Sequence, residues 1–183
     1  MILFIAIACA LAKRKGCRIA PIFREWSLYP LYLTEIVFWV MQIAAWTGHY
    51  LFVPYAEWIQ TAFTLVLLFP ILKFRLYSTA CVGCGLVAIG SFLNKLVMNA
   101  NGGKMPVFPT LSRWTIYFRD GAIEEANDYL HCVMDSSSKL KFLADWVDCG
   151  FSILSVGDVL IHSFVLIVVY KIVIELNKRS CKS

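Results

Sequence analysis

The sequence has little charge: only 16% of its 183 residues are Asp, Glu, Lys or Arg, compared with about 25% in soluble domains. Hydrophobic residue types make up 60% of the chain, and the mean hydropathy is +0.70. This balance excludes an ordinary soluble domain and indicates a single membrane domain over residues 1–183. The Lys and Arg lie in short clusters between apolar runs, so we expect a lipid bilayer and no nucleic acid as the partner.

Metal and redox signatures are also missing. The seven cysteines do not have the paired spacing of a zinc site. Cys81 and Cys84 match the spacing of a redox pair, but they lie in an apolar run rich in small residues, where close helix packing is the better explanation. We therefore predict no metal and no cofactor.

The apolar run Met1–Ala12 has its basic residues after it, whereas a signal peptide has them before its apolar run.

The longest apolar run, Phe151–Leu176, is long enough to cross a bilayer as a helix. Between Ser152 and Tyr170, Asp158 and His162 are the only side chains that carry charge near neutral pH. They are four residues apart and share a helix face, which we expect to point into a helix bundle.

Four earlier apolar stretches bring the predicted number of transmembrane helices to about five. They are Met1–Ala12, which is short, Leu31–Tyr50, Trp58–Leu72 and Tyr77–Met98. Gly16–Tyr29 mixes basic and apolar residues, as segments at a membrane interface do. The predicted fold class is therefore all-α, a polytopic membrane helix bundle.

The basic residues predict how this bundle is oriented. Ten of the seventeen Lys and Arg lie in Lys13–Arg24, Lys73–Arg75 and Lys178–Lys182, whereas the turn Gly48–Glu57, which contains Pro54, has none. We expect the three basic stretches in the cytoplasm. The amino terminus would then lie outside and the carboxyl terminus, with Cys181, inside.

Residues 99–150 form a segment of about 50 residues that we expect outside the membrane, inserted between transmembrane helices 4 and 5. It carries five basic and seven acidic residues. Gly121–Leu130 and Lys139–Val147 have the patterns of short surface helices. Cys132 and Cys149 are the cysteines within or bordering this segment, and a disulfide between them would stabilise it in an oxidising compartment.

A polar cluster is expected where this segment meets the membrane, and it is the candidate ligand-binding site. Lys95 and Asp158 lie at similar depths, so an ion pair between them is predicted. In the alternative, Lys95 extends outward and Asp158 binds backbone amides near Gly102–Lys104. The candidate residues are Asn94, Lys95, Asn99, Asn101, Lys104, Asp158 and His162.

Two short motifs carry a resemblance. Asn101–Val107 reads Asn-Gly-Gly-Lys-Met-Pro-Val, and Ser155–Val159 reads Ser-Val-Gly-Asp-Val. Together they resemble a bacterial family of small multi-pass membrane proteins with only a domain-of-unknown-function label, which pairs N-G-G-R/K-M-P-V with a later S-x-G-D. The resemblance implies a bacterial plasma-membrane location and attaches no activity.

Three functions remain open, and whether the protein is an enzyme is undecided, with the balance against it. The favoured function is a non-catalytic module that binds a small ligand, peptide or partner protein at its outer mouth. The second is a membrane Cys peptidase that processes a secreted peptide, because His131 adjoins Cys132 and because Cys149 and His162 could lie near the outer face. The third is an ion or proton pathway, which would require a homo-oligomer. Its polar steps would be Glu35, Gln42, Lys95, Asp158 and His162.

Overall fold

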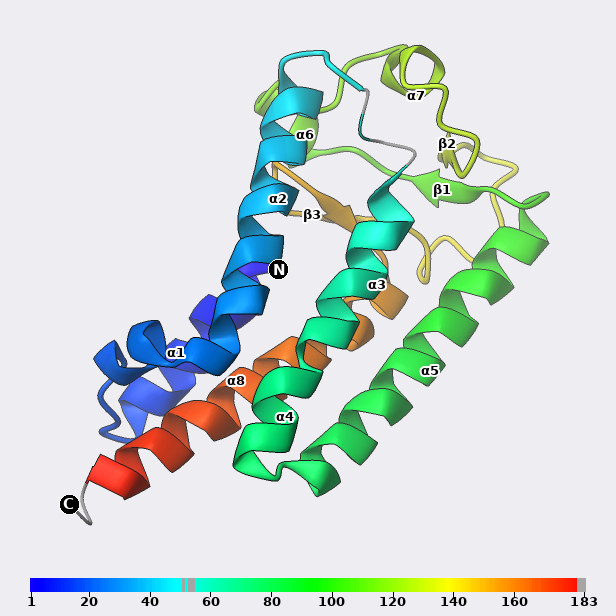
Figure 1. The fold of residues 1–183 in the computed structure, drawn as a ribbon. Coiled ribbons are helices and arrows are strands. Elements are labelled where there is room, and N and C mark those ends of the chain that lie inside the picture. Colours follow the sequence, from blue (N-terminus) through cyan, green and yellow to red (C-terminus); the bar gives the residue numbers. More distant parts are fainter. Residues whose placement is uncertain (51, 53–54, 181–183) are drawn as a thin grey trace. The chain divides into compact units, whose positions relative to one another are not determined.

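The computed structural model describes residues 1–50, 52 and 55–180, and this part of the chain is mainly helical (Figure 1). Its longest helices are α2 (Tyr29–Trp46), α5 (Tyr77–Ala100) and α8 (Val156–Ser180). Three described helical stretches are long and apolar enough to cross a membrane: Trp26–Trp46, which contains α2, Tyr77–Ala100, which is α5, and Val156–Arg179, which is nearly all of α8. The predicted helical class is confirmed to this extent. Pro54 and Cys181 lie outside the described residues.

Two further predicted spans correspond to shorter helices. The first is α1 (Ile2–Arg14), which has 13 residues. The other is divided into α3 (Ala56–Val66) and α4 (Leu68–Phe74), and the apolar stretch Trp58–Phe74 is shorter than a full span. Pro70 lies in the first turn of α4, where a missing N–H costs least. Five spans therefore remain a prediction.

The chain forms two compact units. Unit 1 comprises Met1–Val37, Trp58–Val87 and Ile161–Ser183, and unit 2 comprises Phe38–Glu57 and Ala88–Leu160. In unit 1, Phe4, Ala8 and Ala12 are buried along one face of α1, at the four-residue spacing of a helix. The rest of this core comes mainly from α3, α4 and α8, including Phe63, Leu67, Ile71, Val168, Val169 and Ile172.

The predicted interfacial segment of unit 1 folds as two short 3-10 helices, η1 (Ala20–Arg24) and η2 (Trp26–Leu28). Ile22 and Leu28 are buried, while Phe23 and Trp26 are exposed. The segment thus has apolar side chains on its surface as well as in the core, and its location at a membrane interface stays a prediction.

Unit 2 contains the segment between α5 and α8, which is held by two small ladders. Strand β1 (Met105–Val107) pairs in parallel with β2 (His131–Val133), and β3 (Val147–Asp148) pairs antiparallel with β4 (Ile153–Leu154). The short helices α6 (Leu111–Trp114) and α7 (Ala122–Glu125) lie between β1 and β2 in the sequence. A buried core in this unit consists of Val97 of α5, Met105 of β1 and Ala144, with Met98, Met134, Leu140 and Leu143 packed against it.

The two predicted surface helices need correction. Gly121–Leu130 contains only the four-residue α7, and Lys139–Val147 forms turns rather than a helix. The backbone φ angles of Asn127 and Leu140 are +48° and +53°, a left-handed conformation that ends a right-handed helix. The apolar spacing in Lys139–Val147 does correspond to burial, because Leu140, Leu143 and Ala144 pack in the core, but they do so from turns rather than from a helix.

Candidate functional site

Ser155, Asp158 and Asn94 form a hydrogen-bonded group at the start of α8, within unit 2. The Ser155 hydroxyl accepts from the Asp158 N–H (2.8 Å), and the Asp158 carboxylate accepts from the Ser155 N–H (3.1 Å). This reciprocal arrangement is a capping box. From α5, Asn94 donates to Asp158 Oδ1 (2.9 Å) and accepts from the Ser155 hydroxyl (2.8 Å). Asp158 is thus held by uncharged donors.

Gly157 allows this close packing. A Cβ placed on Gly157 would lie 2.0 Å from Asn94 Oδ1 and 2.5 Å from the Gly90 carbonyl oxygen, distances that real Cβ atoms do not tolerate. The Ser-x-Gly-Asp motif therefore has a structural explanation. Ser155 and Asp158 cap the start of α8, and Gly157 lets α5 pack closely against it.

Asn101 and the two glycines after it end α5 and start the outer segment. The Asn101 side chain donates to the carbonyl oxygens of Val97 (2.8 Å) and Lys139 (3.0 Å) and accepts from the Lys139 N–H (2.8 Å). Gly102 and Gly103 have φ angles of +67° and +88°, which glycine adopts without strain. This motif also has a structural role, since it turns the chain into β1.

A second polar cluster, which we call the acid–imidazole cluster, consists of Asp128, His131 and Asp145. The Nδ1 atom of His131 lies 2.7 Å from Asp128 Oδ2, and its Nε2 atom lies 3.7 Å from Asp145 Oδ2. Strand pairing fixes these positions, because His131 begins β2 and Asp145 bridges to Val107 of β1. The Asp145 N–H donates to the Pro106 carbonyl (3.1 Å), which anchors its backbone.

Asp145 is the least accessible member of this cluster. Its relative exposure is 4%, and its Oδ1 atom has no hydrogen-bond partner among the described residues. Burial, followed by the negative charge of Asp158, raises the pKa of Asp145 to about 7. An isolated buried carboxylate favours its neutral form in this way.

His131 responds in the opposite sense to its surroundings. Burial alone would lower its pKa, but the hydrogen bond to Asp128 and the charges of the three nearby carboxylates raise the pKa above its usual value. The partner Asp128 has a lowered pKa: burial alone would raise it, but the hydrogen bond and charge of His131, together with backbone hydrogen bonds, outweigh burial. No Lys or Arg forms an ion pair with Asp128, Asp145 or Asp158 in the described structure, so the surroundings are acidic.

The predicted ion pair between Lys95 and Asp158 is wrong for the structure as described. The Lys95 side chain is exposed, whereas Asp158 accepts hydrogen bonds from Asn94 and from the Ser155 N–H. An exposed ammonium keeps its hydration, and the amide of Asn94 satisfies the carboxylate without a second desolvated charge. Asn99 and Lys104 are exposed as well.

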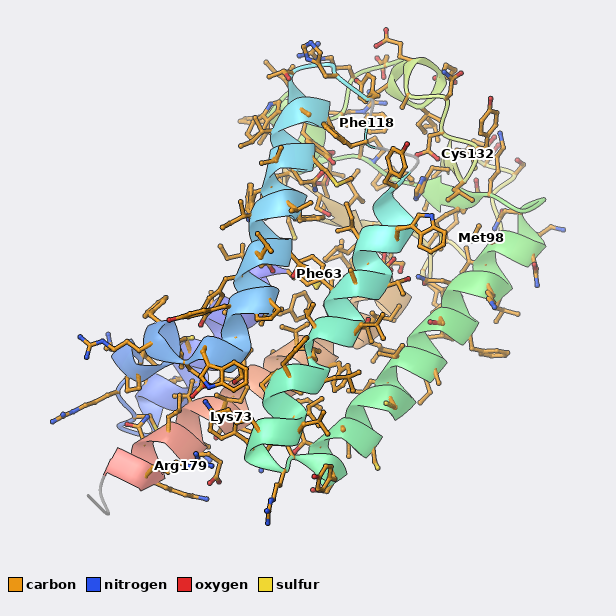
Figure 2. The ribbon with its side chains drawn as sticks, in the orientation of Figure 1. Phe63, Lys73, Met98, Phe118, Cys132 and Arg179 are labelled. Carbon is orange, nitrogen blue, oxygen red and sulfur yellow. The ribbon has the colours of Figure 1, made fainter. Side chains whose placement is uncertain are left out.

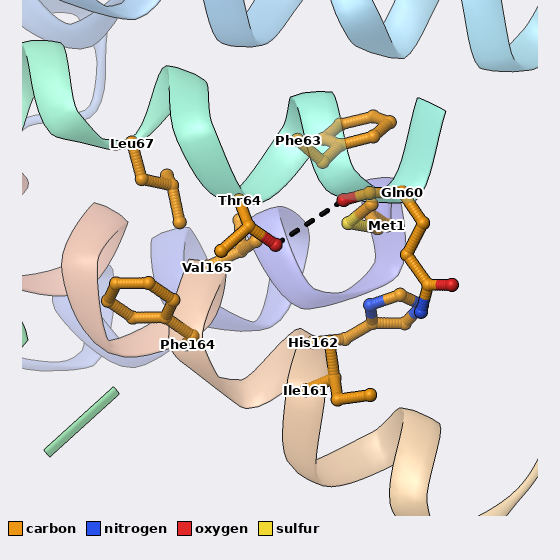
Figure 3. A pocket seen from close by; sticks show the side chains of 9 residues that line it. All are labelled: Met1, Gln60, Phe63, Thr64, Leu67, Ile161, His162, Phe164 and Val165. Atoms are coloured by element: carbon orange, nitrogen blue, oxygen red, sulfur yellow. Dashed lines mark hydrogen bonds between the residues drawn. The ribbon is translucent and has the colours of Figure 1, made fainter. Parts of the chain in front are cut away.

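His162 belongs to unit 1, so the structure does not join it to the Asn94–Asp158 group. Its ring packs edge-on against Phe4, with 5.4 Å between ring centroids. It also lines a small cavity with Met1, Gln60 and Thr64 (Figure 3). The cavity volume is about 10 Å³, which is room for roughly one water molecule and too little for an organic ligand.

The predicted disulfide is absent, since Cys132 and Cys149 are both free. Cys132 lies in β2 opposite Pro106, whereas Cys149 lies in the turn between β3 and β4, so separate backbone ladders hold them. Burial raises the pKa of both thiols, which disfavours the nucleophilic thiolate. His131 faces carboxylates with both ring nitrogens, so nothing supports a Cys–His pair of a peptidase. Among the described residues, no group of His, Cys, Asp and Glu could hold a metal ion.

Comparison with known proteins places the chain in a family. Residues 20–170 match the family of unknown function DUF5317. The chain belongs to this family. The DUF5317 chain is also similar to an uncharacterized protein of Thermotoga maritima. The two are 32% identical over 143 residues, which cover 75% of this chain and 71% of that protein. No solved structure matches the chain.

Membership of a family of unknown function was predicted from the two motifs and is confirmed. The DUF5317 match does not test those motifs or the multi-pass membrane character expected with them. Neither does the Thermotoga relative supply an activity.

In this DUF5317 chain, sequence reasoning missed the acid–imidazole cluster. Asp128 and His131 are three residues apart but match no motif, and Asp145, distant in the sequence, is brought to them by strand pairing. One signal was present: Asp145 lies between Ala144 and Trp146 in a stretch rich in apolar residues. An acid with apolar neighbours on both sides, the same feature that distinguishes Asp158, indicates a candidate for a buried and functional group.

Proposed function

We propose that the chain is a non-catalytic, multi-pass protein of the bacterial plasma membrane, with about five spans, that binds a small cationic ligand at the acid–imidazole cluster. The segment between α5 and α8 would face outward and present this cluster. The observation that carries the proposal is the buried Asp145 carboxylate, whose Oδ1 atom has no hydrogen-bond partner among the described residues.

Two physical arguments favour a cation. A buried acceptor without a donor costs about 1–3 kcal/mol, which a bound donor would recover. Three carboxylates, Asp128, Asp145 and Asp158, act on the single imidazole of His131, so the local charge is negative and attracts a positive group. Because Asp145 is almost fully buried, only a small cationic donor such as an ammonium group fits.

The test is thermal unfolding of the purified, detergent-solubilised protein with ammonium or methylammonium chloride, with potassium and sodium chlorides as controls that have no N–H donor. Ammonium or methylammonium should raise the melting temperature saturably at a pH above 7, and less at about pH 5, where a proton occupies the Asp145 carboxylate with its raised pKa. Tetramethylammonium chloride controls for ionic strength, because it has no N–H donor and is larger.

The matched variants are Asp145→Asn and Asp135→Asn. The first neutralises the buried carboxylate and should abolish the saturable response. The second neutralises an exposed acid of the same segment and should leave the response intact. An equal response in both variants, or none in the wild type, would refute cation binding at this cluster.

A proton pathway is the second candidate, and Glu35 of α2 favours it. Glu35 is 7% exposed, and both carboxylate oxygens have no hydrogen-bond partner among the described residues. The nearest cation is the Met1 amino group, 3.9 Å from Oε1. An ionisable residue within a membrane span is a functional candidate by default. Proteoliposomes carrying a pH-sensitive dye would test this: Glu35→Gln should abolish any proton flux that the wild type shows, and a wild type without flux would rule the pathway out.

A further inference from the structure

One end of unit 1 gathers basic side chains that are far apart in the sequence. The loop after α1 is tied to the last turns of α8 by two hydrogen bonds: the Arg18 N–H donates to Asn177 Oδ1 (2.7 Å), and Asn177 Nδ2 donates to the Arg18 carbonyl (2.9 Å). The basic residues Lys13–Arg18 therefore lie beside Lys178 and Arg179.

Contacts between cations and aromatic rings bring the end of α4 to the same place. Lys73 Nζ lies 4.6 Å from the ring centroid of Trp26 in η2, and the Arg179 guanidinium lies 4.7 Å from that of Phe74. Figure 2 shows Lys73 and Arg179 at this end of the unit. Such contacts stabilise a cation through its attraction to the face of the ring.

Positive charge at this end far exceeds negative charge. The basic residues gathered here are Lys13, Arg14, Lys15, Arg18, Arg24, Lys73, Arg75, Lys178 and Arg179. The acids are Glu25, which pairs with Lys73, and Glu175, which pairs with Lys178. Seven cations thus have no acidic partner among the described residues.

Exposed aromatic side chains accompany this charge. Phe23, Trp26 and Tyr29 have relative exposures of 66%, 58% and 53%, and they lie in or directly after η1 and η2. Trp and Tyr are enriched where a protein meets the headgroup layer of a bilayer. A segment with both basic and large apolar groups binds to anionic membranes through both.

We infer that this basic–aromatic end, defined by the nine basic residues above with Phe23, Trp26 and Tyr29, binds the headgroups of anionic phospholipids. Seven unpaired cations complement phosphate-rich headgroups, and the aromatic rings enter the adjoining acyl boundary. A single-stranded nucleic acid could also use such charge and stack on aromatic rings. The observation that favours a lipid is that Trp26 begins the stretch Trp26–Trp46, which is long and apolar enough to cross a membrane. The inference shares the membrane location of the proposed function but does not depend on the acid–imidazole cluster.

The test is native mass spectrometry of the full-length protein in a neutral detergent, with phosphatidylglycerol and phosphatidylcholine supplied in equal amounts. The wild type should retain phosphatidylglycerol preferentially, and rising salt should reduce the preference, since salt screens exposed charges. The triple variant Arg14→Gln, Lys15→Gln, Arg24→Gln should lose it, with roughly fivefold weaker binding for each charge removed.

The matched control is Lys104→Gln, Lys139→Gln, Lys141→Gln, which removes three exposed basic side chains of unit 2 and should retain the preference. Equal retention of the two lipids by the wild type, or equal loss in both triple variants, would overturn the inference. The inference would also be overturned if a short single-stranded DNA at low salt displaced the bound phosphatidylglycerol from both the wild type and the control variant. Loss of the cation response in Asp145→Asn with unchanged lipid preference would separate the two proposals.

Discussion

At the scale of single residues, Asp145 is a buried group outside the apolar helices whose charge affects stability. Its pKa of about 7 in the folded protein compares with about 3.9 for an unfolded chain. Between these values the folded protein holds a proton that the unfolded chain has lost, so the free energy of unfolding falls as the pH rises. His131, whose pKa is also raised, acts in the same direction, because its contribution is lost as the pH rises through the folded pKa.

We predict that Asp145→Asn removes most of this pH dependence. Relative to the wild type, the variant should gain roughly 2–4 kcal/mol in free energy of unfolding between about pH 5 and about pH 8, as measured by thermal or denaturant unfolding in detergent. Asp135→Asn is the control with the opposite sign: hydrogen bonds from Ser137 and Ser138 lower the pKa of Asp135, so its contribution is lost as the pH falls. A wild-type–variant difference that does not change with pH would contradict the assignment for Asp145.

At the scale of elements, the approach of α5 to the start of α8 depends on the missing side chain of Gly157. We predict that Gly157→Ala destabilises the protein by about 2–3 kcal/mol or more, because its Cβ would collide with Asn94 and the Gly90 carbonyl. Gly85→Ala in α5 is the matched control, since no atom lies within 4 Å of a Cβ there. That variant should stabilise the helix by about 1 kcal/mol. Thermal unfolding of both variants measures the difference, and equal effects would contradict close packing at Gly157.

The elements also show which features the sequence could predict. The apolar runs of α2, α5 and α8 are recognisable in the sequence because each is predominantly apolar over enough length to form one long helix. Residues 139–147 were misassigned because Leu140, Leu143 and Ala144 have helical spacing, and the positive φ of Leu140 leaves no mark in a hydrophobic pattern. Asn94 and Asp158 were both selected for their polarity, but the sequence could not show that an amide, rather than Lys95, would reach Asp158.

The site was less predictable than the helices for the same reason. Helix periodicity relates residues three or four apart, whereas Val107 and Asp145 meet through a bridge between distant segments. His131 was noticed only as the neighbour of Cys132, although its ring is directed toward Asp128 and Asp145. Non-local strand pairing of this kind is outside what a single sequence reveals.

At the scale of the whole molecule, the distribution of basic residues predicts which regions face the cytoplasm. Two exposed serines allow a matched test: Ser78 follows the basic stretch Lys73–Arg75, and Ser136 lies in the segment between α5 and α8. Native cysteines are poorer reporters. Cys132 is half-buried and its thiol pKa is raised, so it would react slowly even if it faced outward.

We predict that Ser136→Cys, in a cysteine-free background, reacts with a membrane-impermeant maleimide on intact cells, whereas Ser78→Cys reacts only after the cells are opened. Restoring Cys17 or Cys181 alone should give the result seen for Ser78→Cys, because both lie in or beside basic stretches that we place in the cytoplasm. The two serine variants are chemically identical changes at exposed positions, so a difference in labelling reports location rather than reactivity. Labelling of Ser78→Cys but not Ser136→Cys on intact cells would reverse the orientation, and the acid–imidazole cluster would then face the cytoplasm. Equal labelling of both would place the two regions on one side and exclude the arrangement in which α5 crosses the membrane.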